Sequence, residues 1–144
     1  MPPEPSIELI AADQLLDRVR ALRAHDCRFV QMSATRLVDR VEVTYSFDRR
    51  GELLNLRLHL SAAAPRLPSI SSIYGCVLLY ENELHDLFNI QVDGMAVDFH
   101  GNLYKTSIKF PFGTVKASPA KPSPPPTTAA CAPVAAAKVV SPDP

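Results

Sequence analysis

Residues 41–60, "VEVTYSFDRRGELLNLRLHL", decide the fold that this sequence predicts. Apolar residues occupy every second position through most of both halves of the segment, and "DRRG" separates the two halves. Because successive side chains of a strand point to opposite faces of a sheet, this period of two predicts two strands with one buried face. A polar stretch with a glycine is typical of a turn, so we expect a hairpin. The alternating apolar positions are Val41, Val43, Tyr45, Phe47, Leu54, Leu56, Leu58 and Leu60.

The residues before this hairpin predict a strand, a helix and another strand. "SIELI", residues 6–10, and "CRFVQMSAT", residues 27–35, are the strand candidates. Between them, residues 11–26 place apolar side chains at helical spacing and charged ones elsewhere, which indicates an amphipathic helix over a sheet. The apolar face of this predicted helix consists of Leu15, Leu16, Val19 and Leu22.

The residues after the hairpin predict a second helix and more extended chain. A helical region is expected at residues 71–88, after the turn-forming "APRLP". Extended stretches are expected at "IQV" (residues 90–92), "MAVDF" (95–99) and "LYKTSIKF" (103–110), with "DG" and "HGN" as turns. The predicted fold class is therefore α+β: a single domain with a largely antiparallel mixed sheet and helices packed on one side.

The composition places the domain boundary near Gly113. With 144 residues, 47% of them apolar, the chain can bury one ordinary core. Residues 114–144 are dominated by alanine and proline, lack aromatic residues and show no period of two or 3.6. Such a segment buries too little apolar surface to offset its ordering entropy. We therefore predict a folded domain at residues 1–113 and a disordered tail at residues 114–144.

Charge and hydropathy exclude several classes of protein. Fifteen basic and fifteen acidic residues give zero formal charge, which argues against a nucleic-acid partner. The longest apolar runs are far below the roughly 18 residues of a membrane-spanning helix. The N-terminal residues do not resemble a secretory signal, so we expect a cytoplasmic protein. Three widely spaced cysteines, Cys27, Cys76 and Cys131, fit neither a disulfide framework nor a zinc or iron–sulfur motif, and we interpret them as structural or incidental thiols.

The candidate functional segment is "YENELHDLF", residues 80–88, which combines three carboxylates, an amide and a histidine with aromatic residues. On a helix, Glu81 and His85 lie one turn apart and could provide two metal ligands. His59, His100 or Cys76 could in principle complete the set. Ferritin-like sites, however, repeat a Glu-x-x-His pair on facing helices, and neither this spacing nor a second copy occurs here.

Catalysis and partner binding are the other interpretations of this segment. Glu83 and Asp86 could act as an acid–base pair, but the sequence has no phosphate-binding loop and no nucleophile motif beside them. A solvated helix face would explain the charges alone. Carboxylates beside aromatic residues also suit a polar interface with arginine or lysine of another protein. The residues by themselves leave the interface and the solvated helix open.

A family resemblance bears on this choice. "PSI" at residues 68–70, "YENELHDLF" and Gly94 resemble the signature of the 30-kDa subunit of respiratory NADH:quinone oxidoreductase. The form "ENELHDLF" with "DFHGNLYKTSIKFPFG", residues 98–113, is more similar to the homologous small subunit of membrane-bound energy-converting [NiFe] hydrogenases of the Ech type, including the CO-induced kind. The resemblance covers about residues 6–113.

The resemblance implies a non-catalytic docking subunit with a complex I 30-kDa-subunit-like fold and no cofactor of its own. Its partners would be the large nickel-bearing subunit, which is related to the 49-kDa subunit of complex I, the small iron–sulfur subunit and other arm subunits. The [NiFe] centre and the iron–sulfur clusters are expected in those partners. The implied location is the cytoplasmic side of the inner membrane, where the complex couples electron transfer to ion translocation.

The resemblance also assigns residues. The implied interface residues are Tyr80, Glu81, Glu83, Asp86, Leu87 and Phe88, with His85 among them, and the structural motif residues are Pro68, Ser69, Ile70 and Gly94. Asn89 replaces the glycine that usually follows the motif phenylalanine, but asparagine can also adopt a left-handed conformation.

Two further departures separate this chain from the complex I branch. Asn82 stands where that branch commonly has arginine, and the Asp-Leu-Arg-Arg stretch that follows there is missing. Two alternative functions follow. One is the equivalent subunit of a complex I-type NAD(P)H or quinone oxidoreductase. The other is a stand-alone metal-dependent enzyme that uses Glu81, His85 and Asp86.

Overall fold

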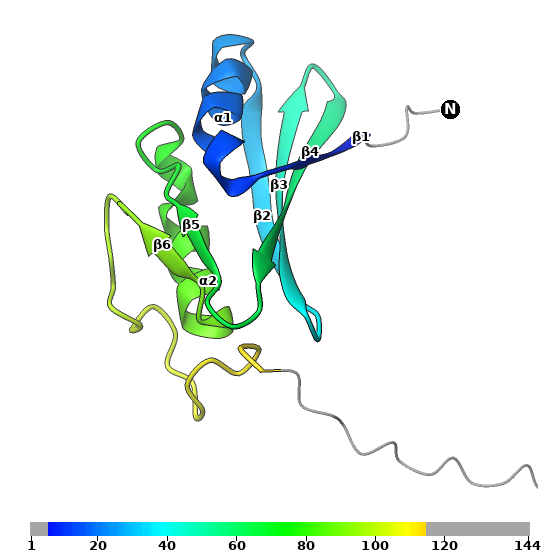
Figure 1. Cartoon of the computed structure of the whole chain (residues 1–144). Helices are drawn as coiled ribbons and strands as arrows, with labels where there is room; N and C mark the ends of the chain where they lie inside the picture. The colour runs from blue at the N-terminus through cyan, green and yellow to red at the C-terminus, as the bar shows by residue number, and fades with distance from the viewer. Residues whose placement is uncertain (1–5, 115–144) are drawn as a thin grey trace, which may run out of the picture.

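The structure, a computed structural model, describes residues 6–114, in which a four-stranded sheet carries both helices on one side (Figure 1). This arrangement confirms the predicted α+β class. A separate pair of short strands lies beside the second helix (Figure 1). The elements in chain order are β1 Ser6–Ile10, α1 Leu15–Ala24, β2 Arg28–Arg36, β3 Arg40–Arg49, β4 Glu52–Ser61, β5 Arg66–Pro68, α2 Leu78–Phe88 and β6 Gln91–Asp93, with 3-10 turns η1 Ala12–Gln14 and η2 Gly75–Val77.

The main sheet has the strand order β1-β4-β3-β2. The predicted hairpin is confirmed as β3 and β4, which pair antiparallel with Val41 opposite Leu60 and Phe47 opposite Leu54. β2 extends the sheet antiparallel to β3, whereas β1 pairs parallel with β4. The two outer strands of the sheet are therefore β1 and β2.

One hydrophobic core fills the space between the helices and the sheet. The predicted apolar face of the first helix is buried at Leu15, Val19 and Leu22. Each fully buried side chain of this size contributes roughly 1.5 to 3 kcal/mol. Aromatic rings join α2 to the sheet, because Tyr80 and Phe47 each pack against Phe29, with ring centroids 5.5 and 5.8 Å away.

Two predictions about the chain after β4 are wrong. The second helix begins at Leu78 rather than at residue 71, because the backbone of Tyr74 is extended, with a φ of −126° and a ψ of 94°, and separates the turn at residues 71–73 from η2 and the helix. The stretches at residues 95–99 and 103–110 form no strands. In the first stretch, the Val97 carbonyl and the Phe99 N–H bind the side chain of Asn82 in α2 and have no neighbouring strand.

Strand β5 was not predicted from the sequence; it lies in the predicted turn "APRLP" and pairs parallel with β6. Of the cysteines, Cys27 is buried and Cys76 is exposed, both as free thiols. Cys131 and all but the first residue of the predicted tail lie outside the described residues. No helix within residues 6–114 is long and apolar enough to cross a membrane.

Two buried tyrosines give a stability prediction. The buried hydroxyl of Tyr45 has no hydrogen-bond partner among residues 6–114, whereas that of Tyr74 donates to the Cys27 carbonyl at 2.6 Å. Tyr45→Phe should therefore leave the free energy of unfolding unchanged or raise it, because an unsatisfied polar group is removed. Tyr74→Phe should lower it by about 1 kcal/mol. Urea denaturation of the two variants measures the difference, and a larger loss for Tyr45→Phe would contradict this assignment.

Candidate functional site

Helix α2 turns polar side chains toward the interior of the protein. Glu81 and Asn82 have no exposed surface, and Asp86 is 6% exposed. Charged residues are rarely buried this fully unless they are paired. Three buried polar residues within six positions therefore mark α2 as the site whose contacts need explanation.

Glu81 binds the turn that follows β5. Its two carboxylate oxygens accept hydrogen bonds from the Ser69 hydroxyl and the Ile70 backbone N–H, both at 2.7 Å. The Ser69 and Ser71 hydroxyls lie 2.6 Å apart, and Ser71 in turn accepts a bond from the backbone N–H of Ala96. Glu81 thus joins the helix to the predicted motif residues Ser69 and Ile70 and, through Ser71, to the chain after β6.

Burial changes the acidity of this carboxyl group. Removal from water raises the pKa of Glu81, and the hydrogen bonds from residues 69–71 lower it by a smaller amount, so that the net shift is upward. The buried Tyr45 hydroxyl has a pKa well above its ordinary value, because of burial and the nearby Glu81 charge. The hydrogen bonds therefore offset only part of the cost of burying the carboxylate.

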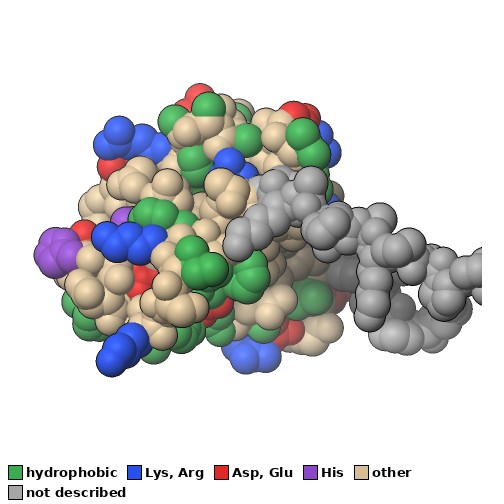
Figure 2. All heavy atoms as spheres, turned by 90° about the horizontal axis from the view of Figure 1, so that it is seen from below, with side chains coloured by type: hydrophobic (Ala, Val, Ile, Leu, Met, Phe, Trp, Pro, Cys, Tyr) green, Lys and Arg blue, Asp and Glu red, His purple; other side chains and the backbone are tan. Residues whose placement is uncertain are grey.

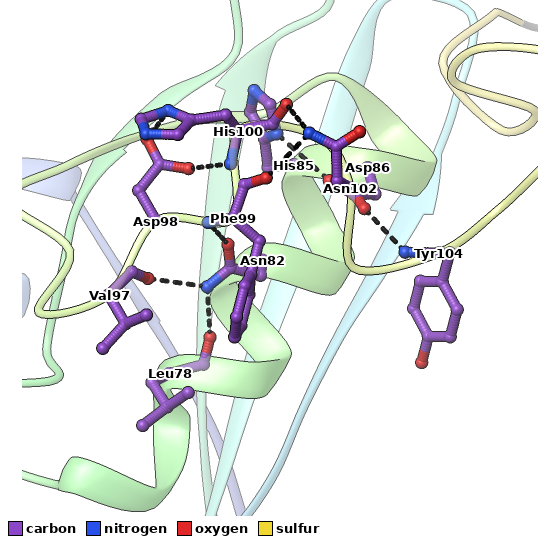
Figure 3. A network of polar contacts seen from close by, with 10 residues as sticks. All are labelled: Leu78, Asn82, His85, Asp86, Val97, Asp98, Phe99, His100, Asn102 and Tyr104. Atoms are coloured by element: carbon purple, nitrogen blue, oxygen red, sulfur yellow. Dashed lines mark hydrogen bonds and ion pairs between the residues drawn. The ribbon is translucent and has the colours of Figure 1, made fainter.

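Asn82 binds the irregular segment after β6, as Figure 3 shows. Its amide nitrogen donates to the carbonyl of Leu78 at 2.7 Å and to that of Val97 at 2.8 Å, and its amide oxygen accepts the N–H of Phe99 at 2.9 Å. The side chain therefore replaces the neighbouring strand that residues 97–99 would have in a sheet. We call residues 95–114 the C-terminal segment.

Asp86 makes the next contact along the helix (Figure 3). One carboxylate oxygen accepts the backbone N–H of Tyr104 at 3.0 Å, and the other lies 3.3 Å from Nδ1 of His85. The Tyr104 hydroxyl donates to Glu83, and the N–H of Phe112 donates to a carbonyl of α2. Helix α2 thus holds the C-terminal segment at several points along its length.

Two of the predicted interface residues bind groups of this chain. Glu81 and Asp86 are buried and direct their carboxylates to the Ser69 turn and to Tyr104, and their role at an interface stays a prediction. The predicted residues that keep exposed surface are half-buried, and their interface role stays a prediction. They are Tyr80, Glu83, His85, Leu87 and Phe88.

The predicted structural motif has clear roles in the chain itself. Pro68 ends β5, Ser69 and Ile70 bind Glu81, and Gly94 has a φ of 80° directly after β6. Asn89 ends α2 with a φ of 57° and a ψ of 38°, the left-handed conformation that glycine and asparagine commonly adopt after the last residue of a helix.

The residues proposed for a metal site do not share one cavity. Glu81 faces the Ser69 turn, whereas His85 and Asp86 face the C-terminal segment. Among residues 6–114, no group of three or more His, Cys, Asp or Glu side chains is arranged to hold a metal ion. The arrangement instead holds two segments of irregular backbone against one helix.

Two residues of this network were not predicted as site residues, Asn82 and Ser71. Asparagine has a low helix propensity and competes for backbone hydrogen bonds, so Asn82 in the middle of a predicted helix indicates a side chain that hydrogen-bonds the backbone. Its position one turn before Asp86 was a second indication that it belongs to the network. Ser71 carried no such signal, because serine is common in turns.

Glu81 gives a prediction about the pH dependence of stability. The pKa of Glu81 is higher in the folded than in the unfolded state, so the folded state binds this proton more tightly. Its contribution to stability should therefore decrease as the pH rises from 4.5, the ordinary glutamate value, through the pKa of the folded state. Above that pKa the penalty is fully present.

The variant Glu81→Gln tests this assignment. It should lose about 1 to 3 kcal/mol at neutral pH, because an amide can accept only at one of the two positions that face donors. The amide does not titrate, so the stability advantage of the original protein over the variant should be larger near pH 4 and shrink as the pH rises. Urea titrations between pH 4 and 8 measure this difference. A difference that is constant over this range would contradict the raised pKa.

Asn82 gives a prediction about the C-terminal segment. The isosteric Asn82→Asp places a carboxylate against the carbonyls of Leu78 and Val97 and should destabilise the fold by about 3 kcal/mol or more. Limited proteolysis should cut residues 95–104 faster than in the original protein. The control Asn89→Asp changes an exposed amide at the end of the same helix and should cost less than about 1 kcal/mol. Equal losses in both variants would contradict the role of Asn82.

Comparisons with known proteins identify the fold and the family. One solved structure that resembles the chain comes from the membrane-bound sulfane sulfur reductase, an archaeal respiratory membrane complex; the TM-score is 0.59, the sequence identity is 19%, and the match covers 65% of this chain and 59% of the other. A second is the trypsin-resistant fragment of Nqo5, with a TM-score of 0.56, 18% identity, and coverage of 63% of this chain and 80% of the other. At these identities the likeness shows the fold alone, and the chain spans 59% of the length of the first of these structures. No curated protein matches the chain. The family model "Respiratory-chain NADH dehydrogenase, 30 Kd subunit" matches residues 9–105, and the chain therefore belongs to this family.

Proposed function

We propose that this chain is a non-catalytic docking subunit in the hydrophilic arm of a membrane-bound energy-converting [NiFe] hydrogenase. It would bind the large nickel-bearing subunit and lie beside the small iron–sulfur subunit, on the cytoplasmic side of the inner membrane. The [NiFe] centre and the iron–sulfur clusters would belong to those partners. Family membership supports an assembly role, and the hydrogenase-like "ENELHDLF" and "GNLYKTSIKFPF" support the finer assignment.

The observation that carries the docking role is the surface of the C-terminal segment. Its backbone is fixed by α2, yet it exposes a series of large apolar or aromatic side chains at 39 to 54%. Figure 2 shows hydrophobic side chains on this side of the molecule, interspersed with basic and acidic residues and histidine. A fixed segment that exposes several large apolar side chains is a candidate protein–protein surface. The residues are Val97, Phe99, Tyr104, Ile108 and Phe112.

A second candidate is the equivalent subunit of a complex I-type NAD(P)H or quinone oxidoreductase. The name of the matching family, which describes an NADH dehydrogenase subunit, favours this candidate. The two candidates differ in the large subunit, because a hydrogenase needs paired cysteines to bind nickel. A neighbouring gene for a large subunit with those cysteine pairs would favour the hydrogenase, and a large subunit without them would favour the second candidate.

Affinity purification from membranes tests the docking role itself. A tagged chain expressed in its own organism should recover a large hydrogenase-like subunit and an iron–sulfur subunit after mild detergent extraction. Metal analysis of the recovered complex should find nickel and iron. Recovery of the tagged chain alone, as a monodisperse protein, would contradict the proposal.

Glu83 gives a residue-level prediction for docking. Among residues 6–114, its carboxylate accepts one hydrogen bond, from the exposed Tyr104 hydroxyl at 3.2 Å, and we expect it to be available to a basic residue of a partner. If docking buries this pair, Glu83→Lys should weaken assembly by about 2 to 5 kcal/mol and leave the stability of the free chain nearly unchanged. The control Glu52→Lys reverses an exposed charge at the start of β4. Subunit recovery should fall for Glu83→Lys only, and equal recovery of both variants would remove Glu83 from the interface.

A further inference from the structure

The edge of strand β2 carries backbone groups without strand partners. β2 is an outer strand, and its only neighbour in the sheet is β3. The Leu37 N–H donates to the Arg40 carbonyl, which fixes the alternation of hydrogen-bonded and non-hydrogen-bonded pairs along the two strands. By this alternation, the N–H and C=O groups of Ala34 and Arg36 point away from β3. No backbone hydrogen bond from another segment of residues 6–114 reaches them.

An apolar groove lies beside this edge. It has a volume of about 470 Å³ and a predominantly apolar lining. One wall is the end of β2, and the other is formed by the last residue of α2 together with the C-terminal segment, where the rings of Phe88 and Phe112 lie 5.4 Å apart. The lining residues are Ala34, Thr35, Arg36, Phe88, Pro111, Phe112 and Thr114.

The groove carries one kind of charge. Among its lining residues, Arg36 is the only charged residue and none is acidic. The Arg36 guanidinium donates to the carbonyl of Ala62 at 2.6 Å through one nitrogen, which leaves other N–H groups for a ligand. A carboxylate is the ligand that best matches a guanidinium.

From these features we propose that the groove binds an extended segment of a partner subunit, which adds to the sheet as a strand along residues 34–36. Unpaired edge groups provide main-chain hydrogen bonds, and the groove accepts alternate side chains, which is how strand addition combines affinity with specificity. The segment carries aliphatic side chains toward Phe88 and Phe112 and an acidic side chain toward Arg36. This inference rests on the proposed function, since it needs an assembled complex.

The chain itself is a poorer source for this strand. After the three residues that follow Thr114, the chain continues as "SPAKPSPPP", residues 118–126, and proline has no N–H to donate to the edge. A second copy would have to present an acidic, aliphatic strand, but its outer strand β1 already uses Glu8 to bind Arg18. The experiment below distinguishes these two occupants, residues 115–144 and a second copy of the chain, from a partner subunit.

Photo-crosslinking in the purified complex identifies the occupant. Phe112 is replaced by p-benzoylphenylalanine, which keeps an aromatic ring in the groove. The control position is Ile7, which is equally exposed, at 55% against 54%, and lies on the opposite outer strand β1. Mass spectrometry should map the crosslink at position 112 to a proline-free segment of a partner subunit with alternating aliphatic residues and an acidic residue. A crosslink to residues 115–144, to a second copy of this chain, or no crosslink above that at position 7, would overturn the proposal.

Two variants test the binding mode. Ala34→Pro removes an N–H that β3 does not use, and edge strands tolerate proline, so the fold should remain intact. Phe112→Asp places a charge in the apolar groove at an exposed position, and Ile7→Asp is its control. Ala34→Pro and Phe112→Asp should each reduce recovery of the crosslinked subunit at least tenfold, and Ile7→Asp should leave its recovery unchanged.

Melting temperatures of the free chains show whether the variants are folded. Phe112→Asp still tests the groove if Ala34→Pro unfolds.

The docking function and the strand addition fail in different ways. If the original chain recovers no partner, the docking function fails. If it recovers partners and both groove variants recover them equally well, only the strand addition fails.

Discussion

The carboxylate of Glu81, which is closed off from solvent, fixes the position of helix α2 relative to the turn after β5. An ionised carboxylate in a protein interior costs several kcal/mol, and each hydrogen bond to a charged group returns roughly 1.5 to 3 kcal/mol. The donors at Ser69 and Ile70 therefore offset much of that cost, while the raised pKa shows that they do not offset all of it. A helix shifted by one residue would leave this charge buried without donors, so Glu81 specifies the register of α2 as well as stabilising it.

The C-terminal segment depends on the same helix. Residues 95–114 have no strand or helix of their own, so their backbone groups need partners from elsewhere. Asn82 and Asp86 provide these partners along one side of α2, one turn apart. An irregular segment that is fixed in this way can expose apolar side chains in a defined arrangement, which a mobile loop could not do without an entropy cost on binding.

The sequence predicted the parts of the fold that repeat. The period of two in residues 41–60 and the helical spacing of Leu15, Val19 and Leu22 each reflect burial of one face, and the structure confirms them. It failed at residues 95–99 and 103–110, which were expected to be extended because the turn signals "DG" and "HGN" separate them. Residues 97–99 have no neighbouring strand, because the side chain of Asn82 in α2 occupies backbone groups that a strand would pair. Local pattern does not contain this long-range contact.

At the candidate site, likewise, two of the acidic residues of the sequence motif are not among the exposed residues that form the proposed docking surface. The acidic motif residues Glu81 and Asp86 were expected at a surface, because in a single sequence a carboxylate on a helix looks the same whether it faces solvent or a buried N–H. In the folded chain they hold the turn after β5 and the C-terminal segment, whereas the docking surface that we propose includes Glu83 and the exposed apolar residues of that segment. Such a motif can therefore be shared by subunits of complexes with different chemistry, since it specifies how the chain folds.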